Sequence, residues 1–248
     1  MTHPHHAEHG GHPGAAISAV HGHDDPEFVE KLNRERPYVM WAVFAGGSFA
    51  ADDAAQIAAE VEAGIAKTGV KVRGFYDLSG YRHDADLMAW FIADTPEKLQ
   101  AAYRVIARGK LGVEPVWSVI AQHKPAEFNK AHLPGMFVHE EAPKYASVYP
   151  FVRSYDWYLI EPWKRAAIMR NHGMAGREFG DLVTSTLATF ALSDYEWVVS
   201  LEGDDLTRIV DLLYAFRNTE ARMYIRQDTP FFTGVKCELA DWARKQAR

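Results

Sequence analysis

Short runs of apolar residues, separated by polar turns, divide most of the chain into predicted strands and helices. Residues 36–47, RPYVMWAVFAGG, combine β-branched and aromatic residues and end at a glycine pair, which predicts a strand. Residues 52–69, DDAAQIAAEVEAGIAKTG, predict an alanine-rich amphipathic helix that ends at Gly69. VRGFYDLSG and ADLMAWFIAD then predict two strands joined by a polar turn, and Thr95 and Pro96 open a helix over EKLQAAYRVIARG.

The same order of patterns returns in the second half of the chain. FALSDYEWVVSLEGDDLTRIVDLLYAFR aligns with FYDLSGYRHDADLMAWFIADTPEKLQAAYRVIAR so that Trp197 matches Trp90 and Leu206 matches Leu99. Each copy reads as strand, turn, strand, acidic cap and helix. We therefore expect an α+β fold with two ferredoxin-like halves that form a dimeric α+β barrel, its antiparallel sheets covered by helices on the outer face.

The predicted domain organisation has three parts. Residues 1–25 hold seven of the twelve histidines among glycine, proline and alanine, with almost no large apolar residue, so we expect a disordered tail. A His-rich tract can bind copper, zinc or nickel, but the irregular spacing here gives no dedicated site. We expect an N-terminal ferredoxin-like domain at residues 26–140 and a C-terminal one, which carries the chemistry, at residues 141–248.

Composition and charge narrow the class of protein. Of the 248 residues, 48% are hydrophobic and 24% charged, which predicts a globular protein with a substantial core. The net charge of −6 argues against nucleic-acid binding, but residues 144–248 carry 14 basic and 14 acidic side chains and would tolerate an anionic ligand.

Cysteine usage and hydropathy bear on the compartment. Cys237 is the single cysteine, which excludes an intrachain disulfide or a thiolate cluster and fits a reducing compartment. No apolar run reaches the roughly 18 residues of a membrane span, and no apolar N-terminal segment predicts a signal peptide. We expect a soluble, cytoplasmic protein without a membrane span.

The stretch AAIMRNHGMAGREF, residues 166–179, places a histidine near the end of a short helical pattern. The helix begins near Pro162, because proline is tolerated in a first turn, and the glycines that follow the histidine offer stops. Counting back from His172 by three and four reaches Met169 and Ile168, so the ring shares an apolar face. From this stretch alone, a structural histidine bonded to a carbonyl remains an alternative.

Candidate functional side chains gather between the two repeats and in the helix that follows. No nucleotide-binding, serine-hydrolase or zinc-protease motif accompanies them, and no carboxylate-rich spacing supports a zinc or di-iron site. A histidine on an apolar helix, redox-capable aromatic residues and arginines for carboxylates are the parts of a haem pocket. The candidates are His123, His132, His139, Tyr145, Tyr149, Arg153, Trp157 and His172.

Two motifs at a fixed separation carry a resemblance to a known family. ASVYPFVRSYDWYLI followed by RAAIMRNHGMAGREF resembles the core of the chlorite dismutase-like superfamily, in particular its actinobacterial coproheme decarboxylases. The similarity extends from about Arg36 to the C-terminus and includes VMWAVF, DLSGYR and the closing TEARMYIRQDTPFFTG. Only the His-rich tail falls outside it.

The resemblance implies roles for particular residues. His172, in MRNHG, matches the proximal histidine that binds the porphyrin iron, and Tyr149, in YPFVRS, matches the catalytic tyrosine. His132, in NKAHLPG, matches the actinobacterial distal histidine, which would act as general base. The matches near the substrate and its propionates are Arg153, Trp157 as a secondary contributor, and Arg217 or Arg222.

The reaction implied by the resemblance is oxidative decarboxylation of iron coproporphyrin III (coproheme) to haem b, with hydrogen peroxide as co-substrate. Two propionates become vinyl groups through a three-propionate intermediate, and the substrate also serves as the cofactor. A radical on Tyr149 would abstract hydrogen from the propionate. Members of the family assemble as rings, so a homo-oligomer, a homopentamer, is implied, together with contact with the coproporphyrin ferrochelatase.

Other functions remain open at this point. Chlorite turnover in the family uses a distal arginine about 13 residues after the proximal histidine, and Ser185 stands there, in DLVTSTLATFAL, which lacks arginine. A weak haem peroxidase or a non-catalytic haem-binding or haem-sensing protein would need His172 but not Tyr149.

Overall fold

The computed structural model describes residues 25–247, so nearly all of the predicted His-rich tail lies outside the described residues. Within them, no helix combines the length and the apolar character that crossing a bilayer requires. The strands are β1 (Tyr38–Gly46), β2 (Lys71–Asp77), β3 (Leu87–Ala93), β4 (Val113–Gln122), β5 (Tyr145–Arg153), β6 (Val183–Ala188), β7 (Trp197–Gly203), β8 (Ile225–Gln227) and β9 (Phe232–Cys237). The helices are α1 (Pro26–Glu35), α2 (Ala54–Ala66), α3 (Pro96–Ala107), α4 (Gly135–Val138), α5 (Pro162–Ala175), α6 (Leu206–Arg217) and α7 (Leu239–Gln246), with 3-10 turns η1 (Ala51–Asp53), η2 (Arg177–Phe179) and η3 (Glu220–Tyr224).

The strands form one antiparallel sheet that closes on itself. Its order is β7-β6-β4-β1-β3-β2-β9-β5-β8, and an additional pairing of β5 with β7 completes the ring. Strands β4 and β6 meet through a single residue pair, Gln122 and Ala188. Each half of the chain contributes the strand–helix–strand–strand–helix–strand order of a ferredoxin-like unit. The predicted α+β fold with two ferredoxin-like halves is therefore confirmed.

Side chains alternate between the inside and the outside of this barrel, as the period of a strand requires. On β1, Val39, Trp41 and Val43 point inward, whereas Met40, Ala42 and Phe44 point toward helices. The inward set comes from eight strands and includes Tyr76, Trp90, Val119, Val148, Leu187, Val198 and Phe232. Apolar burial of this size is the largest favourable contribution to folding.

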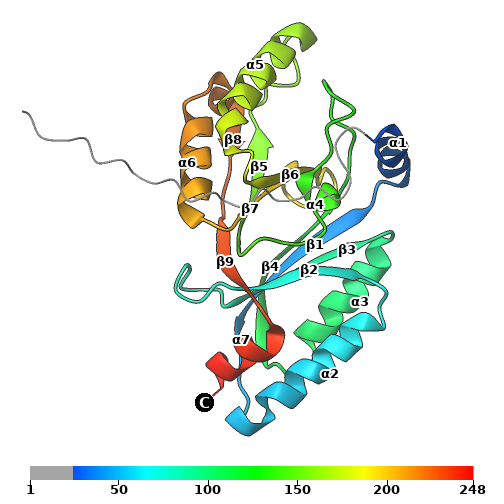
Figure 1. Cartoon of the computed structure of the whole chain (residues 1–248), viewed down its shortest axis with the longest axis vertical. Helices are drawn as coiled ribbons and strands as arrows, with labels where there is room; N and C mark the ends of the chain where they lie inside the picture. The colour runs from blue at the N-terminus through cyan, green and yellow to red at the C-terminus, as the bar shows by residue number, and fades with distance from the viewer. Residues whose placement is uncertain (1–24, 248) are drawn as a thin grey trace, which may run out of the picture.

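Helices cover the outer face of each half. Figure 1 places α2, α3 and α7 at one end of the molecule and α5 and α6 at the other, with the sheet between them. Over the N-terminal half, Leu99, Ile106 and Trp242 pack with strand residues such as Phe91 into an apolar layer. Helix α7 thus brings the end of the chain back onto the N-terminal half.

The repeat holds in the order of its elements and differs in detail. Trp90 lies in the middle of β3 and is fully buried, whereas Trp197 begins β7 and is only partly buried. The second hairpin turn occupies residues 189–196, so Phe190 lies in the turn and not in a strand. Because β3 begins three residues before Trp90 whereas β7 begins at Trp197, the alignment based on tryptophan spacing is out of register with the strands by three residues.

Candidate functional site

Helix α5 carries His172, the histidine predicted to bind the porphyrin iron. It begins at Pro162, as predicted, and ends at Ala175 with Gly176 as C-cap. Gly173 is helical and does not stop the helix, because the helix continues for two more residues before the chain turns. Ile168 is buried below His172, so this face of the helix packs against the protein as expected.

The His172 ring is held on two sides. It stacks on Phe216 of α6, with ring centroids 4.0 Å apart and planes inclined by 26°, and its Nδ1 lies 3.2 Å from the Thr219 hydroxyl. Burial, and secondarily the positive charge of Arg153, lower the pKa of His172 to about 4. The imidazole is therefore neutral near pH 7, which a metal-binding histidine requires.

Arg153 ends β5 beneath the same helix. Its side chain is 9% exposed, its guanidinium lies 4.1 Å from the centre of the Trp157 ring, and Nη2 is 3.5 Å from the Met169 sulfur. No carboxylate of residues 25–247 lies within ion-pair distance of it, and burial lowers its pKa to about 10. A buried cation without a counterion is costly, so this environment favours an anionic ligand.

Tyr149 lies on the outer face of β5, four residues before Arg153. Its ring is 7% exposed and stacks on Phe231 at a centroid distance of 4.4 Å. Burial raises the pKa of Tyr149 to about 12, Asp228 adds to the rise and two nearby arginines oppose it. The phenol stays protonated near neutrality. In the described part of the chain its hydroxyl has no hydrogen-bond partner, so it is free to face a ligand.

Those two arginines are Arg217 and Arg222, and they share one carboxylate. Nη1 of Arg217 lies 2.5 Å and Nη1 of Arg222 2.7 Å from the same oxygen of Asp228. Two cations balanced by one anion leave a net positive charge beside Tyr149. A second carboxylate bound here would complete the neutralisation.

Trp157 lies in the turn after β5 and is 4% exposed. It packs with Ile168 and Ala221, and its ring centroid lies 5.3 Å from that of Tyr224. Its contact with Arg153 links it to the basic group. It is thus a buried turn residue and not a residue of the sheet.

His132 lies on the exposed loop between β4 and α4. Its backbone N–H donates to the carbonyl of Asn129 at 3.0 Å. The loop is tied to α5 through Glu127, whose carboxylate lies 2.6 Å from Arg165. The structure therefore brings the loop to the helix that carries His172, but leaves His132 at its surface.

Ser185 points away from the face that carries Tyr149. Strand pairing places Tyr149 opposite Val199, and Val199 opposite Thr186, so these three share the outer face. Ser185 faces the barrel interior, where its hydroxyl accepts a hydrogen bond from the Met136 N–H at 3.0 Å. The residue of β6 nearest to Tyr149 on the outer face is a threonine, and β6 contains no arginine.

The arrangement fits an iron porphyrin with carboxylate substituents. His172 would hold the iron, since its neutral imidazole faces aromatic and aliphatic neighbours. Arg153 on one side and the Arg217–Arg222 pair on the other would bind carboxylates. The unpaired buried guanidinium of Arg153 and the unbonded hydroxyl of Tyr149 are the observations that support this fit.

Sequence reasoning missed the residues that support these side chains. Thr219 and Phe216 hold His172, while Asp228 and Phe231 contact the arginine pair and Tyr149. All four lie in the last third of the chain. Thr219, Asp228 and Phe231 fall within TEARMYIRQDTPFFTG, where the available signal was the motif as a whole and not any single position.

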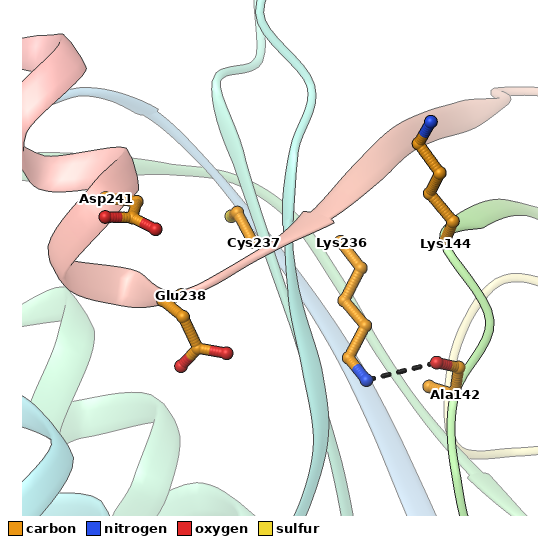
Figure 2. A pocket seen from close by; sticks show the side chains of 6 residues that line it. All are labelled: Ala142, Lys144, Lys236, Cys237, Glu238 and Asp241. Atoms are coloured by element: carbon orange, nitrogen blue, oxygen red, sulfur yellow. Dashed lines mark hydrogen bonds between the residues drawn. The ribbon is translucent and has the colours of Figure 1, made fainter.

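A second candidate region lies where β9 runs into α7. Figure 2 shows an open depression there, lined by basic, acidic and small side chains. They are Ala142, Lys144, Lys236, Cys237, Glu238 and Asp241. The Lys236 ammonium donates to the Ala142 carbonyl at 3.0 Å, so its polar group already has a partner. Burial, with a smaller effect of Asp77, raises the pKa of Cys237 to about 12. This thiol is not a nucleophile near neutral pH.

Comparison with known proteins finds relatives that match most of the chain. Residues 53–237 match the family model described as chlorite dismutase. A coproheme decarboxylase of Mycolicibacterium smegmatis is 42% identical over 224 residues, which cover 87% of this chain and 96% of that protein. A putative heme-binding protein of Natronomonas pharaonis is 35% identical over 88 residues, 35% of this chain and 15% of that protein.

A solved structure agrees with the fold. The chlorite dismutase of Candidatus Nitrospira defluvii, in complex with imidazole, superposes with a TM-score of 0.77. The alignment covers 88% of this chain and 99% of that one, at 20% sequence identity. At this identity the likeness concerns the fold alone.

Proposed function

The chain belongs to the chlorite dismutase family, and from that premise we propose that it is a coproheme decarboxylase, which converts coproheme to haem b. The relative of that name is 42% identical and is matched over almost its full length. The observation that carries the proposal is the arrangement around Tyr149, in which a protonated phenol without a hydrogen-bond partner lies near Arg217 and Arg222 and four residues before Arg153 on β5.

The overall reaction balances with hydrogen peroxide as oxidant. Each propionate loses CO2, a proton and two electrons to become a vinyl group, and those electrons reduce one peroxide to two waters with the uptake of two protons. The bound iron porphyrin would supply the oxidising chemistry. Tyr149 would then pass one hydrogen atom at a time, taking it from the propionate β-carbon onto its own phenoxyl oxygen.

The other side chains would bind and orient. Arg153 and the Arg217–Arg222 pair are proposed to hold propionates, and Trp157 to keep Arg153 in place through its ring. His132 is proposed to take a proton from peroxide, since imidazole is the side chain most often used as a general base near neutrality. The three-propionate intermediate would have to turn so that its second propionate meets Tyr149.

Titration with coproheme and then with hydrogen peroxide tests the proposal, with the porphyrin mass as readout. Loss of two CO2 units is expected from the parent. Tyr149→Phe should bind coproheme within about threefold of the parent but convert it at least 100-fold more slowly, since it loses a group that acts only in the reaction. Tyr103→Phe, on α3 of the N-terminal half, is the control. Equal conversion by Tyr149→Phe would contradict the radical role.

The iron ligand has its own test. His172→Ala should weaken coproheme binding by more than about 100-fold, because loss of the ligand exceeds the effects of losing a supporting hydrogen bond. His83→Ala, at an exposed histidine, should bind like the parent. A Soret spectrum that is unchanged in His172→Ala would contradict the assignment.

The rival functions differ in what they need from these residues. A haem carrier or sensor needs His172 alone, and it would leave the porphyrin mass unchanged under peroxide. Chlorite turnover is disfavoured, because the family's distal arginine is absent from β6 whichever face is considered. A weak haem peroxidase would oxidise added reductants while coproheme keeps its four carboxylates.

Self-association forms part of the proposal, as a homopentamer in the cytoplasm that receives coproheme from the ferrochelatase. Large apolar side chains exposed on and around α5 support it, since such groups favour burial at an interface. They are Tyr155, Leu159, Trp163 and Met223. Leu159→Glu combined with Trp163→Glu should lower the oligomer mass measured by light scattering. The two-domain division at residues 26–140 and 141–248 likewise remains a prediction.

A further inference from the structure

Thr219 occupies the junction between α6 and η3, and its hydroxyl lies 3.2 Å from Nδ1 at the edge of the His172 ring. Its hydroxyl donates to the carbonyl of Phe216 at 2.8 Å, and its backbone N–H reaches the same oxygen at 3.3 Å. Its own carbonyl accepts the Arg222 N–H at 3.0 Å. Both sides of Thr219 are thus fixed by hydrogen bonds before any ligand binds.

The direction in which the Thr219 hydroxyl donates its proton determines which ring nitrogen of His172 is protonated. A hydroxyl has one proton to donate, and here the shorter bond, 2.8 Å, takes it to a carbonyl oxygen that can only accept. Toward His172 Nδ1, 3.2 Å away, the hydroxyl oxygen must then act as acceptor. A neutral imidazole in this contact therefore carries its proton on Nδ1.

We propose that Thr219 is a positioning residue that sets the tautomer of His172, so that the lone pair of Nε2 is presented to the iron. The proposal rests on the proposed function for its purpose, but the tautomer is a property of the protein without a ligand. In a neutral imidazole, the hydrogen bond made by one nitrogen decides which nitrogen can bind a metal. Phe216, stacked at 4.0 Å, keeps the ring plane in place.

The same residue links the iron ligand to the arginine pair. Arg217 lies two residues before Thr219, at the end of α6, and Arg222 lies in η3, whose first turn Thr219 caps. The residue that fixes the tautomer and ring position of His172 thus lies in the same short segment as the arginines proposed to bind propionates. A hydroxyl partner also adds no negative charge, so the imidazole remains a neutral ligand, unlike one bonded to a carboxylate.

The first experiment uses the protein without porphyrin. 15N-histidine NMR, with the His172 signals identified by their loss in His172→Gln, reports which ring nitrogen carries the proton. We expect the Nδ1–H form in the parent and in Thr219→Ser, and a substantial Nε2–H population in Thr219→Val, which keeps the shape and loses the hydroxyl. An Nε2–H parent, or a Thr219→Val variant that keeps the pure Nδ1–H form, would overturn the proposal.

The second experiment measures the consequence for the ligand. Thr219→Val should bind ferric coproporphyrin III about tenfold more weakly, the lower end of the effect of removing a supporting partner. Thr219→Ser should bind within about twofold of the parent, as hydroxyl rescue requires. A uniform loss in both variants would indicate a packing role and would overturn the proposal. Failure of the parent itself to bind coproheme would overturn the proposed function, whereas the NMR comparison alone decides the tautomer.

Discussion

Helices cover the outer face of the sheet in both halves, but the side chains buried beneath them differ. Helices α2, α3 and α7 close over the N-terminal sheet with an apolar layer that contains Phe44, Leu99 and Trp242. Over the C-terminal sheet, the apolar group under α6 is smaller, and it adjoins Arg153 and His172. One half therefore supplies stability, and the other holds groups that cost folding free energy but can bind a ligand.

Two buried arginines show the difference most directly. Arg73, on β2 of the N-terminal half, pairs with Glu202 at 3.1 Å and donates to the Met136 carbonyl at 3.2 Å. The Arg153 guanidinium has aromatic rings and a sulfur around it, and among residues 25–247 it forms no ion pair, while the Glu196 carboxylate is bound to the Arg153 backbone N–H at 2.9 Å. A cation that the protein neutralises itself has a structural role, whereas one left unneutralised is available to a ligand.

We call the outer face of the N-terminal half, which α2, α3 and α7 cover, the closed face, and the outer face of the C-terminal half, which carries Tyr149, the open face. The largest expected effect concerns the closed face. Trp242→Ala should lower the free energy of unfolding by about 3–5 kcal/mol, because it leaves a cavity between α7 and α2 and also removes the 3.0 Å hydrogen bond to the Asp86 carbonyl. Tyr149→Phe, on the open face, should cost less than about 1 kcal/mol, because its hydroxyl has no partner to lose. Urea unfolding curves measure both. Similar losses for the two variants would remove the distinction between the faces.

Substituting Arg73 or Arg153 with methionine should change the stability of the unloaded protein in different ways. Arg73→Met should destabilise the unloaded protein by about 3–5 kcal/mol, because it leaves Glu202 buried without its partner. Arg153→Met should be neutral or stabilising by about 1 kcal/mol, while weakening coproheme binding roughly tenfold. Calorimetry and porphyrin titration separate the two quantities. Destabilisation by Arg153→Met would show that Arg153 is structural.

Two histidines with the same low pKa sharpen the comparison through pH. Burial, and then Arg36, lower the pKa of His123 to about 4, and its Nε2 lies 2.8 Å from the Asn33 amide oxygen. In the unfolded chain the value is near 6.5. The stabilising contribution of neutral His123 is thus complete above about pH 6.5 and is lost as the pH falls toward 4.

As the pH falls from about 6.5 to about 4, the difference in the free energy of unfolding between the parent and His123→Gln should shrink by on the order of 2 kcal/mol. Bound coproheme should leave this difference unchanged, because His123 lies outside the proposed site. Unfolding curves at several pH values, with and without porphyrin, measure it. A difference that vanishes on porphyrin binding would place His123 in the site.

The smallest effect concerns the loop that carries His132. Glu127→Gln removes the ion pair with Arg165, and since the carboxylate is half exposed the cost should be about 0.4–1 kcal/mol. Proteolysis within residues 123–134 should then accelerate about twofold to fivefold, as that free energy predicts. Asp94→Asn, which removes the 2.7 Å pair with Lys98 on α3, is the control and should leave loop cleavage unchanged. Equal acceleration in both variants would mean that the pair does not hold the loop.

The sequence predicted the elements well, because period and caps are local. The strand at Tyr38, the helices that open at Pro96 and Pro162 and the doubled order of elements were all readable from spacing. Closure of the barrel was not, because the one residue pair that joins β4 to β6 and the return of α7 onto α2 connect residues far apart in the chain. Such contacts leave no periodic trace.

The candidate site was predicted unevenly for the same reason. Tyr149, Arg153 and His172 lie in compact motifs, and the structure brings them and their neighbours to one face. Thr219 and Asp228 lie in the TEARMYIRQDTPFFTG motif, but they act through partners up to 47 residues away in the chain, so the motif did not single them out. Ser185 was chosen by counting residues, and counting does not reveal which face of a strand a side chain occupies.

The return of α7 onto α2 also has a consequence for synthesis on the ribosome. Trp242 completes the cover of the N-terminal sheet, yet it follows α2 by more than 170 residues. At 5–20 residues per second, the apolar face of α2 is complete roughly 10–35 s before that cover has been made. The nascent chain must therefore leave the part of this core that Trp242 covers exposed until translation is nearly finished.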